Sequence, residues 1–194
     1  MFKEDISNED LNELPLSQYK GKIEVITDAS LLPQIFEKIN QENVVGFDTE
    51  TKPVFKKGQF NHVSLIQIAI PNLVYLIRIN HTGLSQEIID FIENDKIYKL
   101  GVGLRDDFRA LHKLAEFQSQ GVYELGILAE SMGIQAKSLR KLTGIILGFR
   151  ISKSAQLSNW EAKDLNEKMI RYAATDAWVA LEMFHKLRPG KLIL

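Results

Sequence analysis

The residues best suited to chemistry in this chain are acids, and two of them stand close together. Asp48 and Glu50 lie in the segment VVGFDTE (44–50), whose apolar start predicts a buried strand. Side chains two residues apart on a strand point to the same side, so both carboxylates are expected to project together and repel each other. A hard divalent cation such as Mg²⁺ or Mn²⁺ relieves this repulsion. A solvated strand end is the alternative.

A third acid lies on the apolar side of a helix predicted at 104–116. At about 100° per residue, Asp107 falls on the same arc as Leu104, Phe108 and Leu111, whereas Asp106 falls on the opposite, charged side. Burying an unpaired charge is strongly unfavourable, so Asp107 needs a partner. That partner is a cation shared with the other acids, a buried arginine, or the helix end that the acid caps.

A fourth acid and a phenol come together on a long helix predicted at 165–187. Asp176 lies in the middle of its apolar stripe, and Tyr172 lies one turn earlier on the same side. A tyrosine hydrogen-bonded to a buried aspartate is also an ordinary core arrangement. However, three separate segments now direct acids toward the interior, and shared cations explain all of them. Two divalent ions about 4 Å apart, held by such acids, support phosphoryl transfer.

The elements that must position these residues indicate an α/β fold, a mixed sheet with helices on its faces. Apolar patterns predict strands at 23–27, 44–50, 63–70, 73–79 and 96–102. The two strands on either side of Pro71-Asn72 form a hairpin. Helices are predicted at 28–42, 85–94, 104–116, 123–132, 138–147 and 165–187.

Length and composition predict one domain at 23–194 that follows an N-terminal extension at 1–22. The chain has 194 residues, of which 45% are hydrophobic, and this suffices for a single core. It has no cysteine, which excludes disulfides, thiolate zinc sites and cysteine nucleophiles. The start of the chain is polar and no long apolar run follows, so we expect a cytoplasmic protein without membrane contact.

The four acids and the tyrosine fall in three ordered motifs. These are GFDTET at 46–51, GVGL at 101–104 leading to Asp107, and YAATD at 172–176. With Ser158-Asn159-Trp160 between the last two, the pattern resembles the DnaQ-like (DEDDy) 3′-to-5′ exonucleases, in particular the ribonuclease D and Werner-syndrome exonuclease branch. The resemblance extends from about residue 23 to 188. It implies a ribonuclease H-like fold with a mixed five- to six-stranded sheet, in which three antiparallel strands are continued by parallel ones.

The resemblance also implies a role for each motif residue. Asp48, Glu50 and Asp176 would bind the metal that activates water, Asp48 would bridge to a second metal, and Asp107 would support that second site. Tyr172 would orient or help to deprotonate the attacking water. The implied activity is the release of 5′-mononucleotides from the 3′ end of DNA or RNA, single-stranded or recessed, with two Mg²⁺ or Mn²⁺ ions.

Contacts to the nucleic acid are expected from residues near these motifs: Thr49, Thr51, Lys57, Asn159 and Trp160. Trp160 is either a surface on which a base stacks or a packing anchor. Several basic residues form either a phosphate-binding rim or ordinary solvated charges, and these are Lys52, Lys56, Lys57, Lys137, Arg140, Lys141 and Arg150.

Two other functions remain open from the sequence. One is a catalytically silent module of the same fold that binds nucleic acid or protein, although the complete set of acids argues against it. The other is an enzyme that degrades short oligonucleotides. The formal net charge of −1 favours this second alternative, because tight duplex binders usually carry a basic excess.

Overall fold

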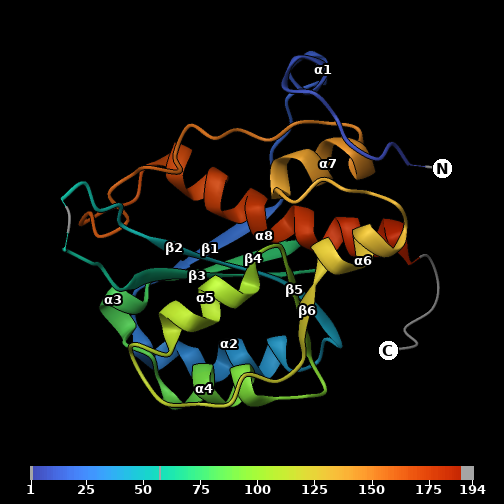
Figure 1. Ribbon diagram of the computed structural model, residues 1–194. Helices are drawn as coiled ribbons and strands as arrows, with labels where there is room; N and C mark the ends of the chain where they lie inside the picture. The colour runs from blue at the N-terminus through green and yellow to red at the C-terminus, as the bar shows by residue number, and fades with distance from the viewer. Residues whose placement is uncertain (1, 57, 189–194) are drawn as a thin grey trace.

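The chain forms three layers, a six-stranded sheet between two groups of helices (Figure 1). The computed structural model describes residues 2–56 and 58–188. The strands are β1 Lys22–Ile26, β2 Val44–Thr51, β3 Val63–Ile70, β4 Leu73–Ile77, β5 Tyr98–Gly101 and β6 Val122–Glu124. The predicted mixed sheet flanked by helices is confirmed.

The sheet has the strand order β1-β4-β3-β2-β5-β6. Strands β2, β3 and β4 are antiparallel neighbours, and β5 and β6 continue the sheet parallel to β2. This matches the expected pattern of three antiparallel strands continued by parallel ones. At the other edge β1 adds a further strand, parallel to β4.

Two groups of helices cover the two faces of the sheet (Figure 1). One face packs against α6 Leu125–Ser131, α7 Leu139–Leu147 and α8 Glu167–Leu187. The other packs against α2 Leu32–Ile39, α4 Gln86–Glu93 and α5 Leu104–Leu111. Short elements complete the fold: α1 Asn8–Glu13, the 3₁₀ turn Ala29–Leu31 and α3 Ile79–Thr82.

Several of the predicted elements differ at their ends from those observed. The segment predicted as a helix at 123–132 begins as strand β6 and becomes helical only at Leu125. The helix predicted at 28–42 divides into a 3₁₀ turn and the shorter α2, with Pro33 in the first turn of α2. Helix α5 ends at Leu111, before the 116 that was predicted. Such boundaries depend on tertiary contacts more than on local pattern.

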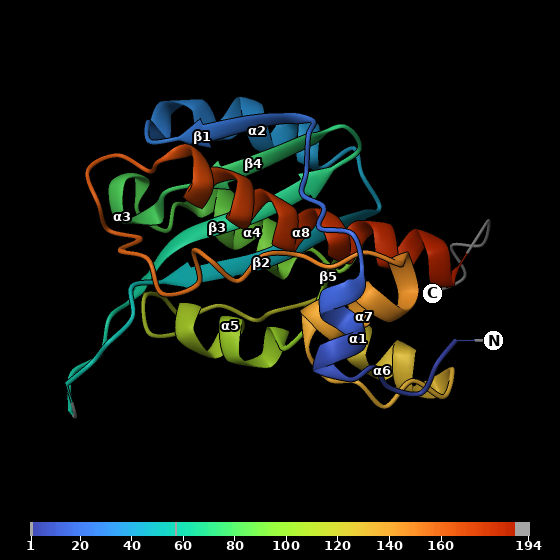
Figure 2. The same ribbon diagram turned by 90° about the horizontal axis from the view of Figure 1, so that it is seen from above.

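Helix α8 crosses the sheet over β2 at very short range (Figure 2). A Cβ atom built on Gly46 would lie 1.9 Å from the Ala177 carbonyl oxygen, so only glycine fits here. Residues two apart on β2 share a face, and Gly46 therefore marks the face on which Asp48 and Glu50 also lie. The close crossing is what brings α8 within reach of these acids.

Local capping fixes where the two helices that carry acids begin. The Asn166 side chain accepts a hydrogen bond from the Met169 N–H at 3.0 Å, which starts α8. Helix α5 starts after Gly103, which has a φ of 83°, in the left-handed region that favours glycine. The Glu124 carboxylate accepts from the Gly103 and Leu104 N–H groups at 2.9 and 3.0 Å, and so ties β6 to the start of α5.

Residues 2–21 pack onto the domain along α7 and α8. Ile6, Leu11 and Tyr19 are buried, and Leu11 contacts the helix α7 at Gly144. The division into an extension at 1–22 and a domain at 23–194 stays a prediction. None of the helices in the described ranges combines the length and apolar character that crossing a membrane requires.

The close crossing of α8 over Gly46 can be tested by substitution. We expect Gly46→Ala to lower the free energy of unfolding by about 1–3 kcal/mol, because the added methyl group must displace the α8 backbone. Urea denaturation measures this change. Gly126→Ala, in helix α6, is the control, since its Cβ would meet only the flexible Glu124 carboxylate, at 3.3 Å. An unchanged unfolding free energy in Gly46→Ala would contradict the packing described.

Candidate active site

Three carboxylates from β2 and α8 converge at one point. Asp48 and Glu50 lie at the end of β2, and Asp176 comes from the middle of α8. One carboxylate oxygen from each residue lies within 4.8 Å of the others. Glu50 and Asp176 are only 9% and 5% exposed, so this group is largely withdrawn from water. The structure thus brings together the acids of the first and third sequence motifs.

Asp107 stands beside this group, at the first turn of α5. Its carboxylate accepts a hydrogen bond from the Thr49 hydroxyl, which links α5 to β2 between the two acids of that strand. Asp106 points away from the site and forms an exposed ion pair with Arg109 at 2.8 Å. The helical pattern therefore distinguished the inward acid from the outward one as predicted.

Burial and mutual repulsion raise the pKa values of these acids. Desolvation is the main cause throughout, and it raises the pKa of Glu50 to about 10, with further contributions from Asp48, Asp176 and Asp107. The pKa of Asp48 is raised well above its usual range by burial, by Asp107 and by Asp176. Burial likewise raises the pKa of Asp176 to about 7 and that of Asp107 to about 6.

The four acids therefore cannot all be ionised at low cost unless positive charge lies beside them. Among residues 2–56 and 58–188, no lysine or arginine forms an ion pair with any of the four acids. An all-oxygen donor set with crowded, buried negative charge is what hard divalent cations bind. The residues present thus fit a metal site, in which a cation replaces the protons that the raised pKa values would otherwise retain.

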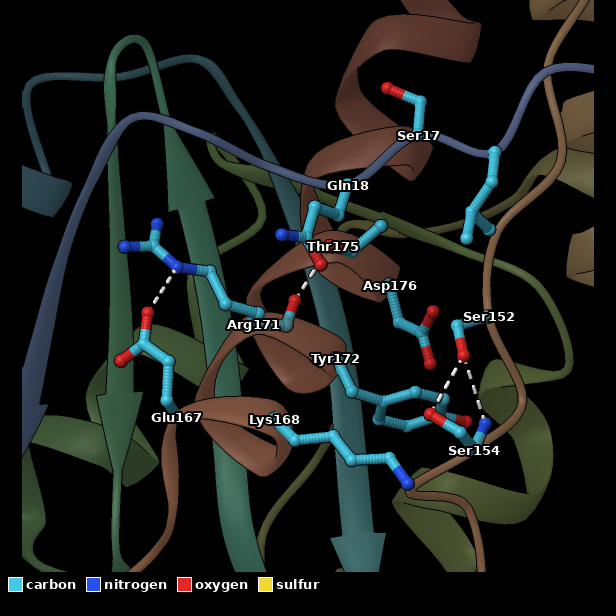
Figure 3. A pocket seen from close by; sticks show the side chains of 11 residues that line it. Ser17, Gln18, Ser152, Ser154, Glu167, Lys168, Arg171, Tyr172, Thr175 and Asp176 are labelled. Carbon is cyan, nitrogen blue, oxygen red and sulfur yellow. Dashed lines mark hydrogen bonds and ion pairs between the residues drawn. The ribbon is translucent and has the colours of Figure 1, made fainter.

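Tyr172 projects from α8 into the same space as Asp176, one helical turn away (Figure 3). Burial first, and then the nearby Asp176 and Glu50 charges, raise the pKa of the phenol far above its usual value, so it stays protonated. The phenol in turn lowers the pKa of Asp176, against the larger effect of burial. Tyr172 is therefore a hydrogen-bond donor beside the acids.

A cleft of about 300 Å³ opens over the acids. Asp48, Glu50 and Asp176 line it together with the start of α7 and residues of the segment 151–156. Arg140 and Lys153 are among these further lining residues. The cleft thus combines acids that can hold cations with basic residues that can contact phosphate oxygens.

Of the basic residues proposed for a phosphate-binding rim, Arg140 lines this cleft, and its guanidinium also donates to the Asn12 side chain at 2.7 Å. Others have partners elsewhere: Lys52 pairs with Glu161 and Lys137 with Glu130, each at 2.9 Å. Lys141 pairs with Asp5 at 2.9 Å. Lys153 and Gln156 also line the cleft, although neither was predicted as a substrate contact.

The expected substrate contacts have mixed positions. Thr49 lines the cleft, although its hydroxyl is engaged by Asp107, and Thr51 ends β2 just beyond a shift in strand register. Asn159 is exposed, and its side chain accepts from the Glu161 N–H at 3.2 Å. Lys57 lies outside the described residues.

Of the two roles expected for Trp160, the structure supports the packing anchor and not the surface for base stacking. Its side chain is 0% exposed, and its ring lies 6.1 Å from that of Tyr172, centroid to centroid. A buried indole cannot offer a face to a base in this structure. Arg78 fixes the same loop by donating to the carbonyls of Lys163, at 2.7 Å, and Ala162. Trp160 is thus a packing anchor behind Tyr172.

Comparison with known proteins agrees with this geometry. The mouse bifunctional 3′-5′ exonuclease/ATP-dependent helicase WRN is 31% identical over 186 residues, which cover 91% of this chain and 13% of the relative. Mouse exonuclease 3′-5′ domain-containing protein 2 is 32% identical over 164 residues, or 78% of this chain and 25% of the relative. The chain thus spans a quarter or less of the length of these relatives.

Solved structures show the same fold. The Nibbler EXO domain of Aedes aegypti superposes with a TM-score of 0.78 at 21% identity, over 88% of this chain and 90% of that one. RNase D of Escherichia coli superposes with a TM-score of 0.76 at 22% identity, over 86% of this chain and 44% of that one.

One family model, described as 3′-5′ exonuclease, matches residues 23–190 and so includes all four acids and Tyr172. This chain belongs to the 3′-5′ exonuclease family.

Proposed function

We propose that this chain hydrolyses phosphodiester bonds at the 3′ end of a nucleic-acid strand, releases 5′-mononucleotides, and depends on two Mg²⁺ or Mn²⁺ ions. The observation that carries the proposal is the buried group of Asp48, Glu50 and Asp176, whose oxygens lie within 4.8 Å of one another. Family membership supports the same reaction. We further propose that residues 23–194 form the catalytic domain and that the protein is cytoplasmic, the latter from its sequence alone.

The acids divide into two overlapping metal-binding sets in this proposal. Asp48, Glu50 and Asp176 would hold one ion, and Asp48 with Asp107 would hold the other. When bound, such ions offset the charge of the phosphate and make a water molecule acidic near neutral pH. Thr49 keeps Asp107 in place through its hydroxyl. Because these ions supply the acidity, the chain needs no histidine base.

Tyr172 would act by donating a hydrogen bond. Its raised pKa keeps the phenol protonated at neutral pH, so it orients the attacking water rather than removing the proton. Arg140 and Lys153, which also line the cleft, would contact the phosphate oxygens as negative charge develops. Packing of Trp160 against Tyr172 limits the positions that the phenol can take.

The cleft favours single-stranded ends and short oligonucleotides over duplex. Its volume of about 300 Å³ accommodates little more than the reacting nucleotide. The net charge of −1 provides little long-range attraction for a duplex. The structure of the complex of Trypanosoma brucei RNase D with RNA U12 shows that a protein of this fold takes a strand of RNA. Both DNA and RNA ends are proposed substrates here.

The direct test uses 5′-labelled DNA and RNA oligonucleotides, single-stranded and duplex, with Mg²⁺, Mn²⁺ or a chelator. We expect a ladder that shortens from the 3′ end only when metal is present. Asp48→Asn keeps the size of the side chain but removes a shared ligand, and should lower kcat/KM by about 100-fold or more. A ladder that persists in chelator or in this variant would refute the mechanism.

Neighbouring acids on α5 provide a matched pair for the second metal position. Asp107→Asn should lower kcat by about 100-fold, because the inward carboxylate would be lost. Asp106→Asn removes an equal charge one residue away, from an exposed ion pair, and should change kcat less than about twofold. Steady-state kinetics on a short single strand compares the two. Equal losses in both variants would show that overall charge matters, and not the position of Asp107.

The raised pKa values predict how stability varies with pH. A group whose pKa is raised by folding stabilises the fold below its unfolded value, about 4 for these acids, and loses this contribution as pH rises through its folded value. The folded values are about 6 for Asp107, about 7 for Asp176 and about 10 for Glu50. In chelator the free energy of unfolding should therefore fall between pH 5 and pH 9.

Saturating Mg²⁺ should remove most of this fall in the free energy of unfolding with pH, because a cation bound only by the folded state offsets the charge of the acids. Urea denaturation at each pH, with and without Mg²⁺, measures both effects. Asp48→Asn should lose the stabilisation by Mg²⁺. A metal-free protein that gains stability between pH 6 and pH 8 would contradict the charge crowding described.

A further inference from the structure

A second hollow of about 430 Å³ adjoins the catalytic cleft (Figure 3). The two spaces share Ser152, Tyr172 and Asp176, so they meet at the acids themselves. We call the second space the second lobe. Its walls are the segment 16–18, the serines at 152 and 154, and the first three turns of α8. Nothing in the reaction proposed above uses this space.

The segment that forms one wall lies outside the part of the chain that matches the family, which begins at residue 23. Backbone hydrogen bonds hold it in place. The Ser17 N–H donates to the Arg150 carbonyl at 2.9 Å, and the Arg150 N–H donates to the Pro15 carbonyl at 3.0 Å. The Tyr19 N–H donates to the Thr175 hydroxyl at 3.0 Å, directly beside Asp176. The wall is therefore a fixed part of the site.

The lining of the second lobe is chemically mixed. Lys168 points across it toward Ser154 (Figure 3), and Lys168 forms no ion pair among the described residues. The charge of Arg171, by contrast, is engaged by Glu167 at 2.7 Å. Hydroxyl groups come from Ser152 and Ser154, and apolar surface comes from Leu16 and the Tyr172 ring. One cation, two hydroxyls and an aromatic ring together suit a sugar and base with a phosphate nearby.

We propose that the second lobe binds one of the two nucleosides attached to the phosphate that is cleaved. This inference rests on the proposed function. A phosphodiester held at the acids joins two nucleosides, and the cleft of about 300 Å³ has room for little more than one. Because Tyr172 and Asp176 border both spaces, the other nucleoside has the second lobe within reach. Its volume lies within the range of about 300–1,000 Å³ typical of small-ligand pockets.

This assignment makes segment 16–18, which lies outside the matched region, a determinant of substrate affinity together with Lys168 of α8. Segment 16–18 and Lys168 would set KM, while the acids set kcat. The side chains of segment 16–18 and Lys168 contribute no ligand to the metal group, so filling the lobe should leave metal binding intact.

The test fills the lobe without altering the acids. Leu16→Trp enlarges a side chain that lines the second lobe, and the backbone hydrogen bonds of Pro15 and Ser17 to Arg150 on either side do not depend on that side chain. With a dinucleotide and a five-nucleotide single strand as substrates, KM should rise about tenfold or more, since base stacking contributes this order of affinity. The rise in thermal midpoint on adding Mg²⁺ should match that of the unaltered protein.

Lys168→Ala is a second variant that adds no bulk, and we expect a rise in KM of about threefold or more. Lys163→Ala is its control, because Lys163 is exposed just before α8 and lines neither space. Unchanged KM values in Leu16→Trp and Lys168→Ala would overturn the proposal, as would an equal rise in Lys163→Ala. Absence of exonuclease activity in the unaltered protein would instead refute the proposed function.

Discussion

The site depends on one electrostatic constraint, the close approach of like charges in a place largely closed to water. Helix α8 crosses β2 so near to Gly46 that no side chain fits between them, and this crossing brings Asp176 to Asp48 and Glu50. Burial raises the pKa values of all three, and repulsion raises those of Asp48 and Glu50 further. Such an arrangement costs stability unless a cation joins it. The rest of the fold can be understood as what holds the acids together despite that cost.

Features with a short sequence period could be predicted from the chain alone. Alternation along a strand placed Asp48 and Glu50 on one side, and the helical period separated inward Asp107 from outward Asp106. The expectation of three antiparallel strands continued by parallel ones followed from the family resemblance rather than from the pattern. Both kinds of inference work here because the active-site acids belong to regular elements with strong apolar faces.

Features set by distant partners could not be predicted. Strand β6 has three residues, too few for a pattern, and forms because β5 offers it an edge. The burial of Trp160 depends on Tyr172 and on a loop that Arg78 fixes. Lys52, Lys137 and Lys141 resembled phosphate ligands in the sequence, but acids from other segments pair with them. The packing of residues 2–21 leaves no periodic signal either, although it shapes the wall beside Asp176.

The origin of the acids in distant segments has a consequence for protein synthesis. Asp48 and Glu50 leave the ribosome early, whereas Asp176 follows only with α8, at the end of the matched region. A nascent or prematurely terminated chain that lacks α8 therefore holds only part of the metal group. It also lacks the helix against which β2 and β3 bury one face. The complete metal group can therefore assemble only after the helix has been translated.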